Sequence, residues 1–207
     1  LRKSGGVGAS VINPRLINSG SVEVQMGTLQ LNGGGGQLDG AFNLSAGARL
    51  DLQEGAFAYT TPVNWGGAGE FRFLGGTLTL DQVIPQLQIL GGKLSLLPTF
   101  QGGAITNLTL MGGTLATDLP ITGRLTVGGS AVVNTTNTVT GTLVMTNGGQ
   151  VSGPLVLAPG AELVFGGGRV DQWVRVEAVG LVGSVGVGGG DSFWCGIPNK
   201  ETEHHSG

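Results

Sequence analysis

Carboxylates are the side chains of this sequence with the clearest catalytic chemistry, because two of them held on one surface can cleave a glycosidic bond. The six candidates are Asp51, Asp81, Asp118, Asp171, Glu70 and Glu162. They are spread along the chain, and no two of them fall on adjacent outward positions of the repeat that the sequence contains. We therefore expect them to lie on a solvated face, and we expect no enzymatic activity.

Two segments have the residue types of a metal site. The only histidines, His204 and His205, lie near Glu201 and Glu203, but adjacent histidines in a polar terminal segment lack the pre-set geometry of a site. Residues 33–39 approach the calcium-binding pattern G-G-x-G-x-D, with the aspartate one position late. We interpret these segments as a frayed terminus and a glycine-rich corner. No glycines fit G-x-G-x-x-G and no Gly-Lys-Ser/Thr occurs, so we expect no cofactor and no metal.

Three tryptophans, Trp65, Trp173 and Trp194, have rings that can stack on sugars. Trp65 and Tyr59 fall in residues 56–65, which we interpret below as an insertion, and binding residues concentrate in such segments. Tyr59 and Trp65 are therefore the candidate ligand-binding residues. The alternative, which we favour, is that the tryptophan packs over the edge of a buried core.

The elements that position these residues repeat along the chain. An apolar-x-apolar triplet, a turn with one or two glycines and a second such triplet recur, as in residues 71–80 (FRFLGGTLTL). Strict alternation predicts short β-strands with one buried face, and the glycines supply the positive φ that the corners need. Counted from the first apolar residue of each copy, the successive steps are 20, 29, 16, 21, 17, 18, 12 and 19. Their mean, about 19, is typical of a solenoid.

We therefore predict an all-β fold, a single-stranded parallel β-helix (β-solenoid) of about nine coils over residues 1–190, with residues 191–207 as a non-repetitive tail or cap. At about 4.8 Å per coil, the rod is on the order of 45 Å long. The step of 29 requires an insertion, which we place at residues 56–65, and the step of 12 near Leu143 implies a shortened coil. One interior ladder is expected to contain Val22, Phe42, Phe71, Leu87, Leu108, Leu125, Leu143 and Leu155.

Threonines recur at the expected outward positions, namely Thr77, Thr79, Thr109, Thr114, Thr126, Thr135, Thr136 and Thr138. A threonine ladder on a flat face can order water, as in ice-binding proteins. Threonine also suits any exposed strand position, and Arg72, Gln88 and Ser95 interrupt the ladder. We therefore favour an ordinary strand surface.

Composition narrows the class of partner. Glycine supplies 42 of 207 residues without a Gly-X-Y period, and a chain with 40% hydrophobic and 11% charged residues is atypical of disorder. With 10 basic and 13 acidic residues and no run of either sign, we expect no nucleic-acid partner.

No apolar run reaches the ~18–20 residues of a membrane-spanning helix, so we expect no membrane insertion. Cys195 is the only cysteine, and residue 1 is Leu, so we expect a removed signal or a segment of a longer chain.

Residues 1–8, 16–25 and 27–31 (LRKSGGVG, LINSGSVEVQ and GTLQL) carry a family resemblance. The chain resembles, over residues 1–170, the glycine-rich repeat regions of bacterial secreted proteins, namely the filamentous-haemagglutinin-like and autotransporter-passenger-like adhesins. The resemblance implies a right-handed parallel β-helix, export from the cell and a role in surface structure or adhesion. Residues 191–207 depart from the pattern.

We therefore expect a non-enzymatic, secreted or cell-surface structural or adhesive solenoid, with a glycan or a host or matrix surface as its partner. The first alternative is a subunit that assembles end to end into an extracellular filament, because a solenoid has open strand edges at both ends. The second is a β-helix that binds or cleaves polysaccharide.

Overall fold

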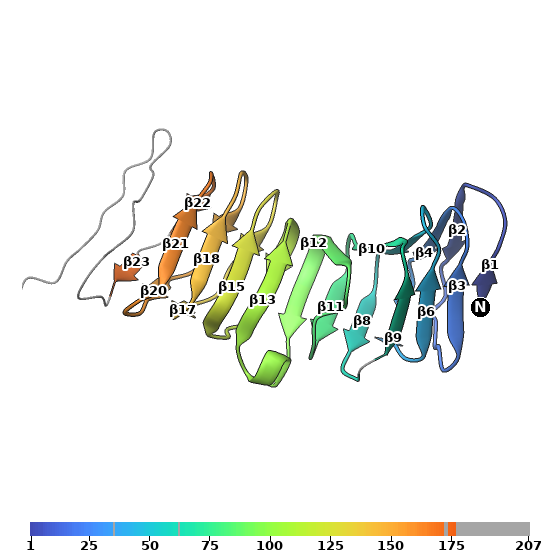
Figure 1. Cartoon of the computed structure of the whole chain (residues 1–207), viewed down its shortest axis with the longest axis horizontal. Helices are drawn as coiled ribbons and strands as arrows, with labels where there is room; N and C mark the ends of the chain where they lie inside the picture. Colours follow the sequence, from blue (N-terminus) through green and yellow to red (C-terminus); the bar gives the residue numbers. More distant parts are fainter. Residues whose placement is uncertain (35, 62, 172–173, 177–207) are drawn as a thin grey trace, which may run out of the picture.

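The computed structural model describes residues 1–34, 36–61, 63–171 and 174–176. These residues form an elongated stack of short strands, shown in Figure 1. The structure is all-β, with 2% helix, 51% strand and about nine turns of a β-solenoid, so the predicted fold class is confirmed. Within the described part, every strand pairing is parallel.

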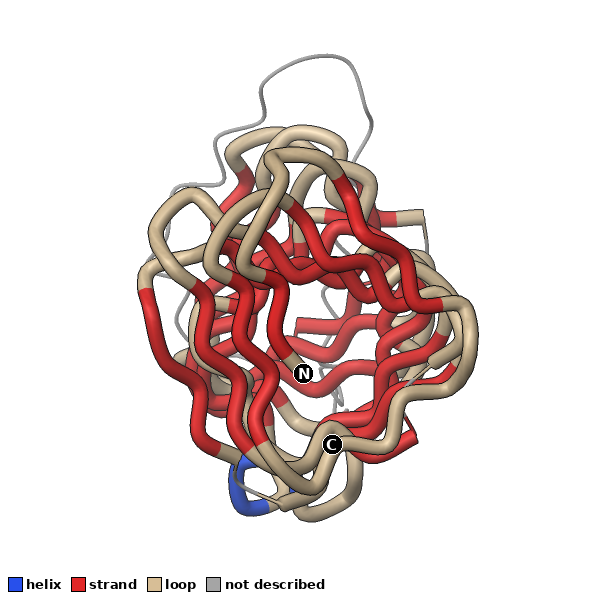
Figure 2. Tube along the Cα trace, turned by 90° about the vertical axis from the view of Figure 1, so that its right-hand side faces the viewer, coloured by secondary structure: helices blue, strands red, loops and turns tan. Residues whose placement is uncertain are grey.

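Each full coil passes through three faces, which surround the core when the rod is seen along its length (Figure 2). Face A holds β1 (Arg2–Lys3), β3 (Ser21–Val24), β6 (Ala41–Leu44), β9 (Asn64–Gly67), the first residues of β13 (Ile105–Leu110) and β15 (Ile121–Val127), β17 (Asn137–Val139), β20 (Leu155–Leu157) and β23 (Val174–Val176). Face B holds β2 (Ala9–Ile12), β4 (Thr28–Leu31), β7 (Arg49–Leu52), β10 (Glu70–Phe73), the first part of β12 (Leu87–Leu96), the remainder of β13 and β15, β18 (Thr142–Met145) and β21 (Glu162–Phe165). Face C holds β5 (Gly36–Gln37), β8 (Ala56–Tyr59), β11 (Thr77–Leu80), the second part of β12, β14 (Gly112–Leu115), β16 (Val132–Val133), β19 (Gln150–Val151) and β22 (Arg169–Val170).

The alternation of the sequence places every second side chain of a strand inside the rod. On face B, Leu29 and Leu50 are in register with Phe71, and the exposed fraction of each is 3% or less. Leu108 and Leu125 form a second ladder nearer the C-terminus. Each fully buried side chain of this kind contributes about 1.5–3 kcal/mol relative to exposure, which explains how strands of four residues hold together.

The predicted single ladder is wrong in its membership. Val22 and Phe42 pair with each other on face A, and Leu155 pairs with Val174 on that same face. Phe71 and Leu143 lie on face B, so the expected ladder mixed two faces. All three faces carry the same apolar-x-apolar triplet, which is why the sequence pattern alone does not distinguish them.

The predicted insertion at residues 56–65 is also wrong. These residues contain β8, which pairs with β5 and β11, and the start of β9, which pairs with β6. The step of 29 spans regular strands on all three faces and omits none. The step of 12 near Leu143 has the same origin, because Leu143 and Leu155 lie on different faces and Leu143 pairs with Leu163 in the next coil.

One coil is short, and it breaks one face. Phe71 pairs with Leu87 after a step of only 16 along the sequence, whereas Leu50 pairs with Phe71 after a step of 21. Residues 81–86 contain no strand, so face A has no strand between β9 and β13. The 3-10 helix η1 (Phe100–Gly102) follows one turn later and buries Phe100 completely.

Candidate functional site

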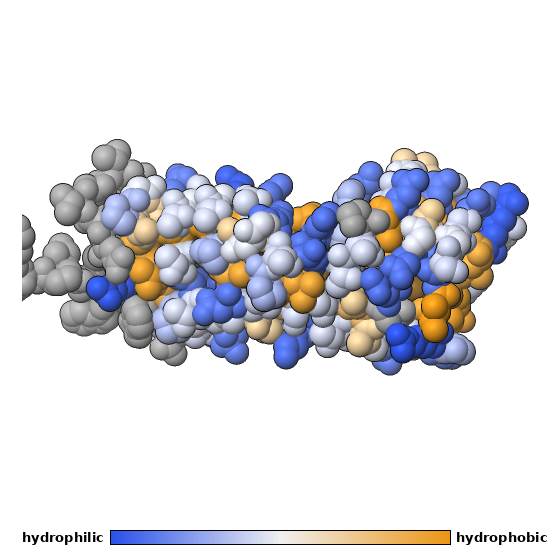
Figure 3. Space-filling view, turned by 90° about the horizontal axis from the view of Figure 1, so that it is seen from below, coloured by the Kyte–Doolittle hydropathy of each residue, from blue (hydrophilic) through white to orange (hydrophobic). Residues whose placement is uncertain are grey.

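The break in the stack is the most distinctive feature of the described surface. Face C continues through it, from β11 to β12 to β14, whereas no pairing joins residues 87–89 of face B to residues 107–110 of the next coil. The rod is therefore divided on two of its three faces and continuous on the third. Figure 3 shows the surface hollowed across the middle of the rod.

The break is wedge-shaped. At its narrow end, the Met111 amide donates to the Ile89 carbonyl oxygen over 2.9 Å, and Leu90 is in register with Gly112. Toward face A the two coils separate and leave between them a hollow of about 190 Å³ that is open to solvent. Its lining consists of Leu80, Val83, Ile84, Gln86, Leu87, Ile89, Asn107, Leu108 and Thr109. None of these side chains is charged.

The two residues other than glycine with positive φ among the described residues both border the break. Gln86 has φ 63° and Gln101 has φ 48°. Such angles cost free energy and persist only where the surroundings impose them. Gln86 directs the chain from the shortened coil into β12, and Gln101 directs η1 toward the edge of β13.

Gln101 covers the edge of β13 with its side chain. Its Oε1 accepts hydrogen bonds from the amides of Thr106 (2.8 Å) and Asn107 (3.2 Å), and its Nε2 donates to the Asn107 carbonyl oxygen (3.0 Å). The carboxamide thus substitutes for the backbone of a neighbouring strand at residues 106–107. Unpaired strand edges promote association of chains, and this contact removes part of one.

The candidate ligand-binding residues lie on regular strands: Trp65 is on β9, the last face A strand before the break, and Tyr59 is on β8 of face C, which continues past the break. The Trp65 ring stacks on Phe42 at 4.4 Å and lies 4.4 Å from Phe71, and the Tyr59 ring is 6.1 Å away. Tyr59 is 4% exposed, and its hydroxyl accepts a bond from the Val63 amide. This geometry favours the packing role. Ligand binding by Tyr59 and Trp65 stays a prediction.

Five of the six candidate carboxylates are engaged by neighbouring side chains, whereas Asp118 is exposed and makes no hydrogen bond or ion pair to the described part of the chain. Asp51 accepts two hydrogen bonds from Arg72, at 2.8 Å from Nε and 2.7 Å from Nη2. Other partners are Arg49 for Glu70, Thr99 for Asp81, Thr142 for Glu162, and Arg169, Gln150 and Ser152 for Asp171. These contacts are those of a structural surface, with each of these carboxylates opposite a donor.

Asp51 and Arg72 form a buried ion pair on the outward side of face B. The side chain of Asp51 is 2% exposed and that of Arg72 is 24% exposed. The hydrogen bond to Asp51 raises the pKa of Arg72, and burial opposes this shift. In the neighbouring pair, the side chains of Arg49 and Glu70 are 47% and 44% exposed.

The glycine-rich corner at residues 33–39 has a steric explanation. A Cβ at Gly33 would collide with the carbonyl oxygen of Asn13 in the coil below, so the close approach of the two coils requires glycine. Asp39 accepts a hydrogen bond from the Thr61 hydroxyl. Among the described residues, no group of three or more His, Cys, Asp or Glu side chains suits a metal ion.

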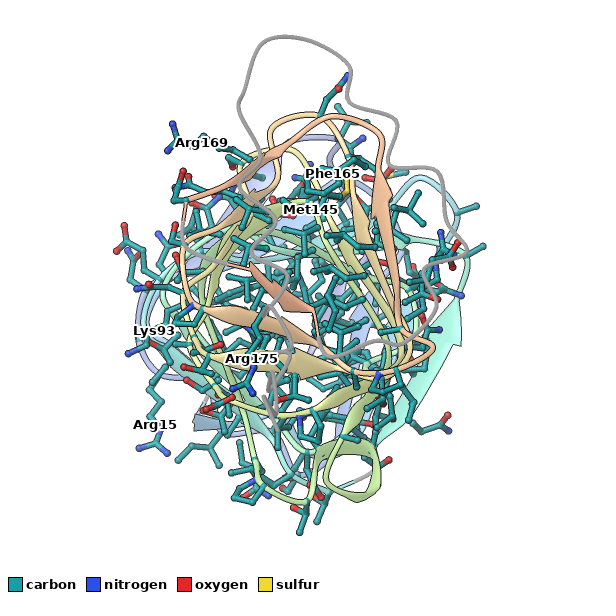
Figure 4. All side chains as sticks on the ribbon, turned by 90° about the vertical axis from the view of Figure 1, so that its left-hand side faces the viewer. Arg15, Lys93, Met145, Phe165, Arg169 and Arg175 are labelled. Atoms are coloured by element: carbon teal, nitrogen blue, oxygen red, sulfur yellow. The ribbon has the colours of Figure 1, made fainter. Side chains whose placement is uncertain are left out.

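The threonines divide among the faces. Thr77 and Thr114 lie on face C, and Thr109 pairs with Thr126 on face B, while Thr138 lies on face A. The long charged side chains extend from the rod: Figure 4 shows Arg15, Lys93 and Arg169 pointing outward, with Met145 and Phe165 turned inward. The surface is a mixture of hydroxyls, amides and scattered charges.

Several predicted features lie outside the described residues: residues 191–207, His204, His205, Cys195, Trp173 and Trp194. The helical content of the described chain is a single turn, so it holds no helix of the length and hydropathy that a bilayer requires.

The residues of the break, including Val83, Gln86, Gln101 and Asn107, are not among the candidates that the sequence pattern predicts. Two signals were present in the sequence. The step of 16 between Phe71 and Leu87 is among the shortest, and residues 81–86 (DQVIPQ) lack an apolar triplet.

The fold places the chain in the class of parallel β-solenoids, which contains enzymes and non-enzymes. Comparisons with protein-family models, curated proteins and solved structures found no match. The likeness to secreted adhesins, and the right-handed winding that it implies, therefore stay predictions.

Proposed function

We propose that this chain is a non-enzymatic structural or adhesive solenoid that acts outside the cell or on its surface. The observation that carries the proposal is the outward column of face B. Its outward positions run in register from Gln30 through Asp51 and Arg72 to Gln88 before the break, and from Thr109 through Thr126 and Val144 to Val164 after it. Six of these eight side chains carry hydrogen-bonding groups. Hydrogen-bonding side chains fixed on a rigid lattice form a surface suited to binding another surface, with little entropy lost by the protein.

The engaged carboxylates support the same proposal. A glycosidase needs one carboxyl group that can donate a proton and another that can attack or activate water. Asp51 accepts two hydrogen bonds from the Arg72 guanidinium, so both of its carboxylate oxygens are taken up by a structural contact. This arrangement gives Asp51 a stabilising function in the stack.

The test is binding of the full chain to an array of glycans and extracellular-matrix proteins. Gln30→Arg and Thr126→Arg change face B in the two halves of the rod, and Thr79→Arg on face C is the matched control. We expect the face B variants to lose binding and the control to retain it. Failure to bind any probe, or release of new ends from uronate or neutral glycans, contradicts the proposal. Protease accessibility on intact source cells tests the location.

End-to-end assembly is a second candidate, favoured by the N-terminal end of the rod. Five of the eight large exposed hydrophobic side chains of the described part are Leu1, Val7, Val11, Ile17 and Met26. Figure 3 shows hydrophobic atoms gathered at this end. The outer edges of β1 and β2 have no partner strand within the described chain, and open edges of this kind invite another strand.

One residue at that end opposes direct stacking. Lys3 is in register with the buried Val24, so it occupies an inward position, and its ammonium donates to the carbonyl oxygens of Gly5 and Gly6. A copy stacked on β1 would bury this charge at a high cost. Light scattering across concentration decides: assembly predicts growth that Lys3→Leu strengthens, and monomers of both proteins at all concentrations reject it.

A further inference from the structure

The hollow in the break has the size and lining of a receptor for one side chain. At about 190 Å³ it is smaller than the 300–1,000 Å³ typical of cofactor and drug-sized sites. Leu80, Ile84, Leu87 and Ile89 form one wall, and Leu108 lies opposite. Val83 stands at the rim with 40% of its surface exposed. An aliphatic or aromatic side chain suits these walls, and a charged one does not.

Two carboxamides flank this hollow. Gln86 and Asn107 are exposed lining residues, and neither side chain makes a hydrogen bond to the described part of the chain. A carboxamide carries a donor and an acceptor, the same pair that a peptide unit presents. Extended segments are commonly recognised through their main chain together with an apolar side chain in a pocket.

The lining distinguishes between partner classes. Sugar rings are usually bound on an exposed aromatic face, and the nearest indole, Trp65, is enclosed between Phe42 and Phe71. The absence of charge in the lining disfavours acidic or basic partners. An uncharged polypeptide is the occupant that matches both the walls and the carboxamides.

From this geometry we infer that the break binds an extended, uncharged segment of another protein, which inserts one large apolar side chain between Leu87 and Leu108 and bonds its main chain to Gln86 and Asn107. This inference rests on the proposed binding function and names the site and the chemistry of a protein partner. Gln101 already occupies the edge of β13 at residues 106–107, so the main chain of the partner meets the side chains of Gln86 and Asn107 there rather than that part of the strand edge.

The experiment measures binding of nine-residue peptides to the full chain by fluorescence polarisation. The probes carry a central Leu, Ile or Phe among Ser, Thr, Asn and Gly, and a matched set carries a central Ala. We expect the Ala set to bind at least about tenfold more weakly, since the anchor side chain dominates such contacts. Val83→Arg should weaken binding by about tenfold or more, and Asn107→Ala by roughly two- to tenfold.

Val11→Arg is the matched control, because Val11 is also an exposed valine, 49% exposed at the far end of the rod. It should leave peptide affinity unchanged, with circular dichroism the same for all variants. The inference is overturned if no peptide binds, if the Ala set binds equally well, or if Val83→Arg and Asn107→Ala have no effect. If Val83→Arg then still binds the glycan or matrix array, the proposed binding function holds and the break is not its site.

Discussion

The ion pair between Asp51 and Arg72 leads to a quantitative prediction about stability. Replacing Arg72 with Met keeps the aliphatic packing and removes both bonds to a carboxylate that is 2% exposed. Loss of one partner of a buried pair costs about 3–5 kcal/mol, because the remaining charge is unsolvated. Water reaches the site of the partly exposed guanidinium, so we expect about 3 kcal/mol, the lower end of that range.

A double variant separates the energetic effect of leaving one charge unpaired from the net contribution of the ion pair. Asp51→Leu with Arg72→Met removes both charges, and we expect the free energy of unfolding to return to within about 1 kcal/mol of the native chain. The matched control is Arg49→Met, which breaks the exposed pair with Glu70 on the same two strands and should cost less than about 1 kcal/mol.

The pair should add no pH dependence to stability near neutrality. The pKa of Arg72 is raised in the folded chain, so the stability that Arg72 contributes is complete below the ordinary arginine pKa and is lost only at higher pH.

Urea denaturation followed by far-ultraviolet circular dichroism gives the free energies, provided that the slopes stay equal. Equal losses for Arg72→Met and Arg49→Met would refute the reasoning, because they would show that burial of Asp51 has no energetic effect. A double variant as unstable as Arg72→Met would refute it as well.

Further predictions concern the core, the corners and the covered edge. Leu108→Asp should unfold several coils together, because it places a charge in the buried core. Thr109→Asp changes the next residue, which is exposed, and should melt within a few degrees of the native chain. An unchanged melting temperature for both variants would contradict the inward position of Leu108. Both Gly27 and Gly47 have positive φ, but only a Cβ at Gly27 would meet the preceding coil, at 2.5 Å from the Gly6 carbonyl oxygen. Gly27→Ala should therefore lower the free energy of unfolding, measured in urea, by about 1–3 kcal/mol more than Gly47→Ala. Gln101→Ala should destabilise by about 1 kcal/mol and increase light scattering at high concentration, and scattering like that of the native chain would argue against its role at the β13 edge.

The sequence was sufficient for the type of fold because the information there is local. Alternation in triplets such as residues 78–80 fixes which side chains are buried, and glycines with positive φ fix the corners. Assignment of triplets to faces was not local. Val22 and Leu29 stand in the same local pattern, in which polar residues flank an apolar one. Only the winding of the whole coil places Val22 on face A and Leu29 on face B.

The candidate site could not be predicted from the sequence for a related reason. The hollow exists because residues 81–86 take a short path and leave two coils unpaired on faces A and B. Ile84 and Phe100 are the buried residues of the segments that border it. The sequence did show Trp65 and Tyr59 as unusual, and Trp65 does lie on the last face A strand before the break. Their rings face the core because Phe42 and Phe71 lie on either side of the indole, a contact between residues far apart in the sequence.

The most direct test of the stacked, in-register coils is disulfide cross-linking in a Cys195→Ser background. Thr109 and Thr126 are in register on adjacent coils, about 4.8 Å apart, which is within the range for a disulfide. Thr126 and Val164 lie two coils apart on the same column, at about 9.6 Å. The solenoid predicts rapid oxidation of the Thr109→Cys/Thr126→Cys pair and none of the Thr126→Cys/Val164→Cys pair, read by mass spectrometry. A cross-link in the second pair, with none in the first, would contradict the parallel stack.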